Sequence, residues 1–313
     1  MKKSLIQRLI QLIPVLLGVT FITFSLTYLS PGDPAQLMLS ATGVEPSPEL
    51  IARVRSEMGL DQPFLKQYAD WLLGLFQGDL GQSFYYNRPV SDLIADRLPA
   101  TLRLAFVSLA VTMLVSVPLG IVSAMKQNKI TDKIIRFFTF GGISIPGFWV
   151  GMILMYVFAL QLNMVNVTAD TGISGMVLPV ATLVFAMASK YTRYIRTAVL
   201  EEWSEPYVFA LKAKGISKPI ILSHYVLKST MLSVVTMVGL SLGSLLGGAI
   251  VVEIVFSWPG VGQLAMDAIH NRDYPLIQGY VVWMSILYVG INFLVDVSYK
   301  VLDPRLRLEK GDG

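Results

Sequence analysis

The sequence predicts an all-α integral membrane protein with six transmembrane helices and both termini in the cytoplasm. Of its 313 residues, 54% are hydrophobic and 15% are charged, whereas a soluble domain usually carries about 25% charged residues. Six apolar stretches have roughly the 20 residues that a helix needs to cross a bilayer. The basic residues between those stretches gather on one side, which the positive-inside rule assigns to the cytoplasm.

The predicted spans are residues 9–29, 104–124, 137–162, 176–195, 232–256 and 277–299. The first span follows a basic N-terminus and superficially resembles a signal peptide. It is long enough to cross a bilayer, however, and no small-residue cleavage site follows it, so we expect a retained helix. The fourth span is the least regular, because Lys190 and Arg193 crowd its end.

The positions of lysine and arginine define the predicted topology. The side assigned to the cytoplasm holds Lys2, Lys3, Arg8, Lys126, Lys129, Lys133, Arg136, Lys190, Arg193, Arg196, Lys212, Lys214, Lys218, Lys228, Lys300, Arg305, Arg307 and Lys310. On the opposite side, the connection 162–175 has no basic residue and the connection 257–276 has only Arg272. The external segment 31–103 contains several basic residues, but long loops are translocated largely regardless of charge.

The external segment contains one amphipathic pattern. Its apolar residues recur at helical spacing, with start signals at Asp61 and Pro63 and a stop at Gly78: Phe64, Leu65, Tyr68, Trp71, Leu72, Leu75 and Phe76. We interpret this stretch as a helix that lies against the outer ends of the spans.

The composition excludes most catalytic chemistry. The chain has no cysteine and only two histidines, His224 and His270, so it lacks the residues for thiolate or histidine-rich metal sites. We interpret His270 as a solvated or hydrogen-bonded external residue. No phosphate-binding loop is present, so any ATP hydrolysis has to come from a partner. We therefore expect no catalytic residues, no metal ligands, no cofactor in this chain and no nucleic-acid partner.

A connection of about thirty residues, 197–228, is long enough to suggest a function. Ser204 is predicted to cap a short helix that has Glu205 and Pro206 in its first turn and Gly215 at its stop position. Bulky and small side chains alternate along this helix, which suits insertion into a groove on another protein. The residues expected to carry this role are Glu205, Tyr207, Ala210, Ala213, Lys214 and Gly215.

The segment 207–215, YVFALKAKG, resembles the coupling loop of binding-protein-dependent ABC importer permeases, specifically the peptide and nickel branch. The resemblance extends along nearly the whole chain, through GDPA at 32–35, LDQP at 60–63, GDLG at 78–81, LPATL at 98–102, SWPGVG at 257–262, RDYP at 272–275 and DPR at 303–305. Two places depart from the family pattern. An acidic residue followed by two alanines is replaced by Phe209, Ala210 and Leu211, and a usual Leu-Pro is Leu232-Ser233.

The resemblance implies a type I ABC importer permease fold in a multi-pass protein of the bacterial cytoplasmic membrane. Its expected organisation is a cytoplasmic end and first helix at 1–30, an extracytoplasmic segment at 31–103, a core transmembrane domain at 104–303 with the coupling loop, and a tail at 304–313. The implied partners are a second homologous permease, two ATPase subunits that bind ATP and Mg, an extracytoplasmic solute-binding protein and membrane lipid.

The stretch 268–275, AIHNRDYP, and the ending 302–307, LDPRLR, look most similar to nickel permeases. Nickel, as a chelate, is therefore the first expectation for the substrate, and a di- or oligopeptide is the alternative. An ion-coupled carrier is the alternative from another class, but the inverted repeats and paired broken helices that it predicts are not found. A membrane-embedded enzyme would need a nucleophile and base or metal ligands at one depth.

Several polar residues remain to be interpreted. Asn292, Asp296 and Lys300 share one helical face, so we favour an internal ion pair for Asp296 over a transport role. Glu253 is expected to contact the outer loop. The candidates for an outer gate or outer loop are Trp258, Pro259, Gly260, Arg272 and Asp273.

Overall fold

The computed structural model describes residues 2–40, 46–166 and 172–302. Within these ranges the protein is helical, and an isolated β-bridge joins Gln82 and Pro89. The chain forms two compact units. The first comprises Met1–Pro99 and Pro259–Gly290, and the second comprises Ala100–Trp258 and Ile291–Gly313.

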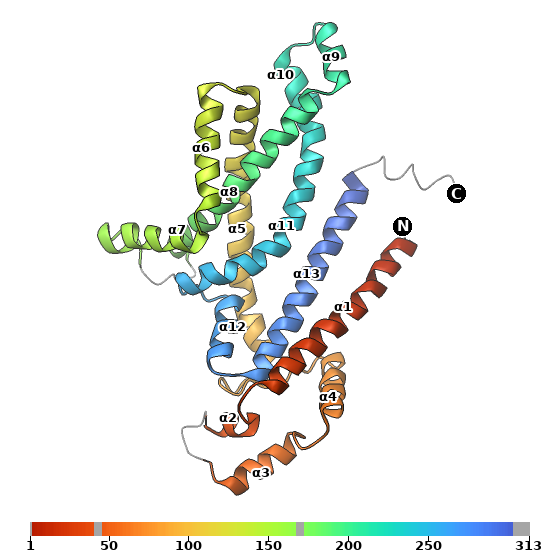
Figure 1. The fold of residues 1–313 in the computed structure, drawn as a ribbon, viewed down its shortest axis with the longest axis vertical. Helices are drawn as coiled ribbons and strands as arrows, with labels where there is room; N and C mark the ends of the chain where they lie inside the picture. The colour runs from red at the N-terminus through yellow and green to blue at the C-terminus, as the bar shows by residue number, and fades with distance from the viewer. Residues whose placement is uncertain (1, 41–45, 167–171, 303–313) are drawn as a thin grey trace. The chain divides into compact units, whose positions relative to one another are not determined.

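The first unit gathers the N-terminal helices and the short helix that precedes the last span. Its helices are α1 (Lys2–Leu29), α2 (Pro34–Ser40), α3 (Pro48–Glu57), α4 (Phe64–Phe76), α12 (Val261–His270) and the first parts of α5 (Val90–Met125) and α13 (Tyr274–Leu302). Figure 1 shows α2 and α4 near the Leu29 end of α1, and α3 packs against α2. Helix α4 has the bounds that the apolar pattern predicts, and its Tyr68 and Trp71 rings pack against Phe24 of α1.

The second unit is built around a long central helix. Its helices are the rest of α5, α6 (Ile130–Ser144), α7 (Gly147–Leu154), the π-helix η1 (Met155–Gln161), α8 (Ile173–Trp203), α9 (Pro206–Ala213), α10 (Lys218–Ile220), the π-helix η2 (Ile221–Val226), α11 (Leu227–Val255) and the end of α13. Helix α8 packs against α6, α7 and α11. A methyl group at Gly142 of α6 would collide with the Ser189 side chain of α8, so the glycine allows these two helices to approach closely.

Several helices match the predicted spans. Among the described residues, four helices are long and apolar enough to cross a membrane, and the count rises to five if the bent pair α6 and α7–η1 is one span. A shorter apolar stretch, Ile13–Leu29, lies in α1. The predicted spans 9–29, 104–124, 176–195 and 277–299 fall inside α1, α5, α8 and α13. The span 232–256 ends within one residue of α11, which begins five residues earlier, at Leu227.

The predicted span 137–162 is broken into two helical segments. The chain bends by 99° between α6 and α7. Pro146 causes the break, because proline has no N–H to donate and disfavours helical geometry in the preceding residue. Ile145 is accordingly extended, with φ −94° and ψ 128°.

Two helices extend past the predicted boundaries. Helix α5 begins at Val90, so the last fourteen residues of the predicted external segment are helical, and α8 continues to Trp203. The predicted loop 197–228 contains the end of α8, all of α9, α10 and η2, and the start of α11. Both helices continue beyond the apolar stretches that predicted the spans. Polar residues can form these extensions, because helix propensity does not require apolar side chains.

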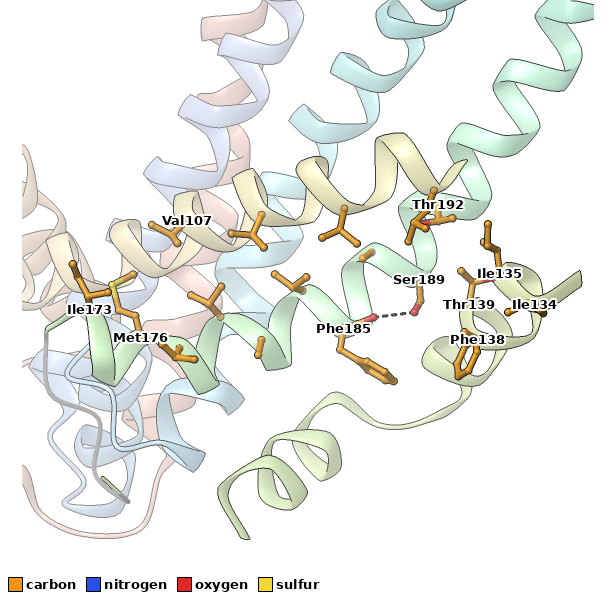
Figure 2. A pocket seen from close by; sticks show the side chains of 18 residues that line it. Val107, Ile134, Ile135, Phe138, Thr139, Ile173, Met176, Phe185, Ser189 and Thr192 are labelled. Atoms are coloured by element: carbon orange, nitrogen blue, oxygen red, sulfur yellow. Dashed lines mark hydrogen bonds between the residues drawn. The ribbon is translucent and has the colours of Figure 1, made fainter. Parts of the chain in front are cut away.

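An apolar groove of about 980 Å³ is lined by α5, α6 and α8, and Figure 2 shows the side chains that line it. Its walls carry hydrocarbon side chains such as Val107, Phe138 and Phe185, together with the hydroxyls of Thr139, Ser189 and Thr192. The Ser189 hydroxyl donates to the backbone carbonyl of Phe185. Because none of the lining residues is ionisable, the groove has no charge with which to bind an ionic cargo.

Candidate functional site

Helix α9 begins immediately after α8, with only Ser204 and Glu205 between them. Glu205 takes the N-cap position with φ −66° and ψ 145°, and Pro206 occupies the first turn, where its missing N–H costs no hydrogen bond. The prediction that Ser204 caps this helix is wrong. Its hydroxyl donates to the Leu200 carbonyl at 2.9 Å, so it serves the end of α8 instead.

The other end of α9 closes with a Schellman motif. The Ile216 N–H donates to the Leu211 carbonyl at 3.2 Å, and the Gly215 N–H donates to the Lys212 carbonyl at 3.0 Å. Gly215 has φ +76°, the left-handed conformation that this motif requires and that glycine adopts without strain. Its predicted role as the stop residue of the helix is confirmed.

Val208 is the buried residue through which α9 packs against the rest of the second unit, and Leu211 packs beside it. Val208 is completely buried in a cluster with Ile195 and Val199 of α8 and with Ile221 and Val226 of η2. These residues all lie where long helices of the unit end or begin. The cluster therefore joins α9 by close packing to α8 and to the helix that continues into α11.

The opposite surface of α9 is exposed, and its contacts within the described chain are with the end of α8. All six residues expected to carry the docking role, from Glu205 to Gly215, are exposed. Phe209 is 61% exposed, although its ring stands 5.0 Å from the Lys212 ammonium, which also lies 4.6 Å from the Trp203 ring. These cation–π contacts hold a positive charge beside an exposed aromatic surface.

Tyr207 is held in one orientation by its hydroxyl. The phenol donates to the Glu202 carboxylate at 2.7 Å. Partial burial raises the pKa of the Tyr207 phenol, and the negative charge of Glu202 raises it further. The side chain is therefore a neutral hydrogen-bonded ring at the edge of the exposed surface of α9.

A buried ion pair between the start of α6 and α8 was not predicted from the sequence. Asp132, which is 0% exposed, accepts hydrogen bonds from Arg196 Nε at 2.8 Å and Nη2 at 3.0 Å. It also accepts from the Ser123 hydroxyl at 2.6 Å and from the Asn128 N–H at 2.9 Å. This pair joins the turn between α5 and α6 to α8. The only signal in the sequence is a single acidic residue among four basic ones, Lys126, Lys129, Lys133 and Arg136.

The five candidates for an outer gate are divided between the two units. Trp258 is completely buried in the second unit, and its indole N–H donates to the Ala100 carbonyl at 3.1 Å. The preceding helix places Glu253 beside it, also buried, accepting from the Thr101 hydroxyl at 2.6 Å. Trp258 and Glu253 thus have structural contacts within their unit.

In the first unit, Gly260 is the N-cap of α12 and Pro259 precedes it. Asp273 is completely buried and accepts hydrogen bonds from the Ser83 hydroxyl at 2.5 Å and from the Leu276 N–H at 3.3 Å. It therefore caps α13 and holds the loop before α5. Arg272, with φ +52°, donates to the Pro31 carbonyl at 3.2 Å.

The remaining polar candidates are placed as follows. The exposed His270 ring contacts the Met266 carbonyl through Nδ1 at 2.9 Å, which agrees with its interpretation as a hydrogen-bonded surface residue. Within the described ranges, no group of three or more histidine, cysteine, aspartate or glutamate side chains is arranged to hold a metal ion. The predicted Asp296–Lys300 pair lies outside the residues whose side chains are described.

Comparison with protein families identifies the chain over most of its length. Residues 116–308 match the family "Binding-protein-dependent transport system inner membrane component", and residues 1–105 match the N-terminal family of the same transport systems. The chain belongs to this family. It is therefore a permease subunit of an ABC importer, a multi-pass inner-membrane protein and not an enzyme, with ATP hydrolysis located in separate subunits.

Curated relatives of this permease cover nearly all of it. It is 36% identical over 308 residues to the metal-staphylopine import system permease CntB of Staphylococcus aureus, covering 98% of this chain and 99% of the relative. It is 39% identical over 307 residues to the glutathione transport system permease GsiC of Salmonella typhimurium, with 98% and 99% covered. Identity to the nickel import system permease NikB of Staphylococcus aureus is 37% over 310 residues, with 99% and 93% covered.

Solved structures show the fold of the permease. A chain of the MetNI methionine ABC transporter in an inward-facing conformation aligns with a TM-score of 0.56 at 17% identity, covering 67% of this chain and 96% of that one. An amino acid ABC transporter chain aligns with a TM-score of 0.56 at 13% identity, covering 67% and 94%. The all-helical architecture of the described residues is thus that of ABC transporter permeases.

Proposed function

We propose that this permease imports nickel, as a chelate, across the bacterial cytoplasmic membrane. The observation that carries the proposal is its similarity to nickel and metal-staphylopine import permeases over nearly its full length. The nickel-like stretches 268–275 and 302–307 point the same way. A di- or oligopeptide is the second candidate, because a glutathione permease is equally similar. The ion-coupled carrier is set aside, because the chain belongs to an ABC importer family.

Deletion of the gene tests the substrate. We expect the deletion strain to lose most of its ⁶³Ni uptake at limiting nickel supplied with its chelator, and to keep its growth on di- and oligopeptides. A strain complemented with the intact gene is the control. Loss of growth on peptides with normal nickel uptake would replace the first candidate by the second.

We infer that α9 is the segment that docks to an ATPase subunit. Support comes from the helix itself, which is terminated at both ends, attached through buried Val208 and exposed at Tyr207, Ala210 and Lys214. A short helix with a free mixed surface fits a groove on a partner. Nucleotide-driven closure of two ATPases would displace α9, and the buried Val208 cluster would pass that displacement to the long helices.

The proposed complex contains a second homologous permease, two ATPases that bind ATP and Mg, and an extracytoplasmic solute-binding protein. The substrate path is proposed to run between the two permeases. In this arrangement the chain has six spans, with the bent α6–α7–η1 segment counted as one, and both termini in the cytoplasm. The domain division at residues 30, 103 and 303 belongs to the same proposal, with α5 crossing the second boundary.

Reporter fusions test this topology. An alkaline phosphatase fused after Gly172 is expected to be active, whereas fusions after Ser204 or Gly313 are expected to be inactive, because the basic connections stay in the cytoplasm. A fluorescent protein that matures only in the cytoplasm should give the reverse pattern at the same sites. Cytoplasmic activity of the Gly172 fusion would contradict the six-span arrangement.

A further inference from the structure

A second cavity, in the first unit, has a lining unlike that of the apolar groove. It encloses about 600 Å³ and is formed by the outer end of α1, the α3–α4 region, Phe84 and the start of α13. A volume of this size is typical of small-molecule sites. In the proposed topology the cavity faces the extracytoplasmic side.

The charged side chains that line the cavity differ in whether they are paired within the protein. Asp33, Asp70 and Arg55 line the cavity. Arg55 is bound by two carboxylates, with Nη1 at 2.8 Å from Asp33 and Nε at 3.0 Å from Asp61, so its charge is offset. Asp70 has no hydrogen bond or ion pair with any residue that the structure describes. The lining therefore has one carboxylate available to a ligand.

The amide side chains of the cavity add acceptors. Gln278 is 8% exposed, and its Nε2 donates to the Thr27 hydroxyl at 2.6 Å. Gln67 donates through Nε2 to the carbonyls of Leu60 at 3.0 Å and Gln62 at 2.7 Å. Gln67 uses both N–H donors of its amide within the protein and Gln278 uses one, and neither carbonyl oxygen has a partner among the described residues. These oxygens remain as acceptors.

Aromatic rings complete the lining. Phe24, Trp71 and Tyr274 contribute to the walls, and the Tyr274 hydroxyl donates to the Pro31 carbonyl at 3.3 Å. Aromatic faces attract cations, most strongly when the cation is removed from water. A free carboxylate, two free carbonyl oxygens and aromatic walls favour a ligand that is positively charged and donates several hydrogen bonds.

We propose that this cavity binds a primary ammonium group. An ammonium offers three donors and one positive charge, which match the Asp70 carboxylate, the Gln67 and Gln278 oxygens and the neighbouring rings. Two sources supply this chemistry on the outer side of a membrane: the α-amino group of a small peptide-like solute and the ethanolamine headgroup of a phospholipid. The choice of these two sources rests on the proposed topology, whereas the ammonium chemistry rests on the cavity lining alone.

The test uses the purified importer complex in nanodiscs, with alanyl-alanine and N-acetyl-alanyl-alanine as calorimetric probes. In phosphatidylglycerol nanodiscs we expect saturable binding of the free dipeptide and none of the acetylated one. Asp70→Asn should weaken dipeptide binding at least about tenfold, because a charged hydrogen-bond partner is lost. Asp70 is exposed, so this substitution should leave the fold intact. Glu49→Gln, which removes an exposed carboxylate elsewhere in the same segment, should change nothing.

A second arm distinguishes the two sources. If the natural occupant is the lipid, adding phosphatidylethanolamine to the nanodiscs should reduce dipeptide affinity, and native mass spectrometry should detect retained phosphatidylethanolamine that Asp70→Asn loses. If the occupant is the solute, added phosphatidylethanolamine should leave dipeptide affinity unchanged. Equal binding of the free and acetylated dipeptides would overturn the proposal. So would the absence of both dipeptide binding and lipid retention, or an Asp70→Asn variant that behaves like the wild type.

Discussion

Replacing Gly215 with valine is expected to abolish substrate uptake while the permease still inserts and assembles. Gly215 has φ +76°, and a Cβ placed there meets no atom within 4 Å. A valine side chain therefore has room at this position. Its backbone is strained, because a β-branched residue adopts the left-handed region at a cost of about 1–2 kcal/mol. The chain can relieve this strain by opening the Schellman motif, which would turn the exposed surface of α9 away from its partner.

The decisive measurement compares substrate-stimulated ATPase activity of the purified complex with uptake into vesicles. Gly215→Asn is the matched control, because asparagine tolerates the left-handed region, and it should retain much of both activities. Gly78→Val introduces the same strain in open space, with φ +83°, and should preserve coupling. Normal uptake and stimulation in Gly215→Val would show that α9 is not the docking segment.

Removing Arg196 is expected to destabilise the permease far more than removing any exposed basic residue. Arg196→Ala leaves the fully buried Asp132 carboxylate without its partner, and breaking a buried pair in this way costs about 3–5 kcal/mol. Asp132→Ala should cost less. The Arg196 side chain is 17% exposed, so its charged group can shift toward water.

Thermal unfolding of the purified protein measures these effects. The double variant Asp132→Ala with Arg196→Ala should be more stable than Arg196→Ala alone, because no unpaired charge remains buried. Arg88→Ala serves as the control, since its ion pair with Asp96 is exposed on both sides and such pairs contribute about 0–1 kcal/mol. Equal unfolding temperatures for Arg196→Ala and Arg88→Ala would show that the buried pair does not stabilise the fold.

Local signals in the sequence were enough to predict many of the helices and their ends. Apolar periodicity predicted α4 with its observed bounds, and the positions of Pro206 and Gly215 predicted α9 and its stop residue. The predicted N-cap of α9, Ser204, lies one residue before the observed N-cap, Glu205. A serine that follows one helix and precedes another can serve either, and the choice depends on where α8 ends.

Features that depend on distant parts of the chain were missed. The Asp132–Arg196 pair joins residues 64 positions apart, and nothing in either local sequence specifies the other partner. The burial of Val208 likewise results from packing against residues of α8 and η2. Hydropathy merged α6, α7 and η1 into one span, because the apolar composition continues across Pro146 while the direction of the chain changes.

The length of α8 has a consequence for assembly. Its 31 residues extend about 46 Å at 1.5 Å per residue, whereas the hydrocarbon core of a bilayer is about 30 Å thick. A helix that crosses the core therefore projects into the aqueous phase before α9 begins. Under the proposal that α9 is the docking segment, an ATPase would meet the permease clear of the lipid and would need no membrane-binding surface of its own.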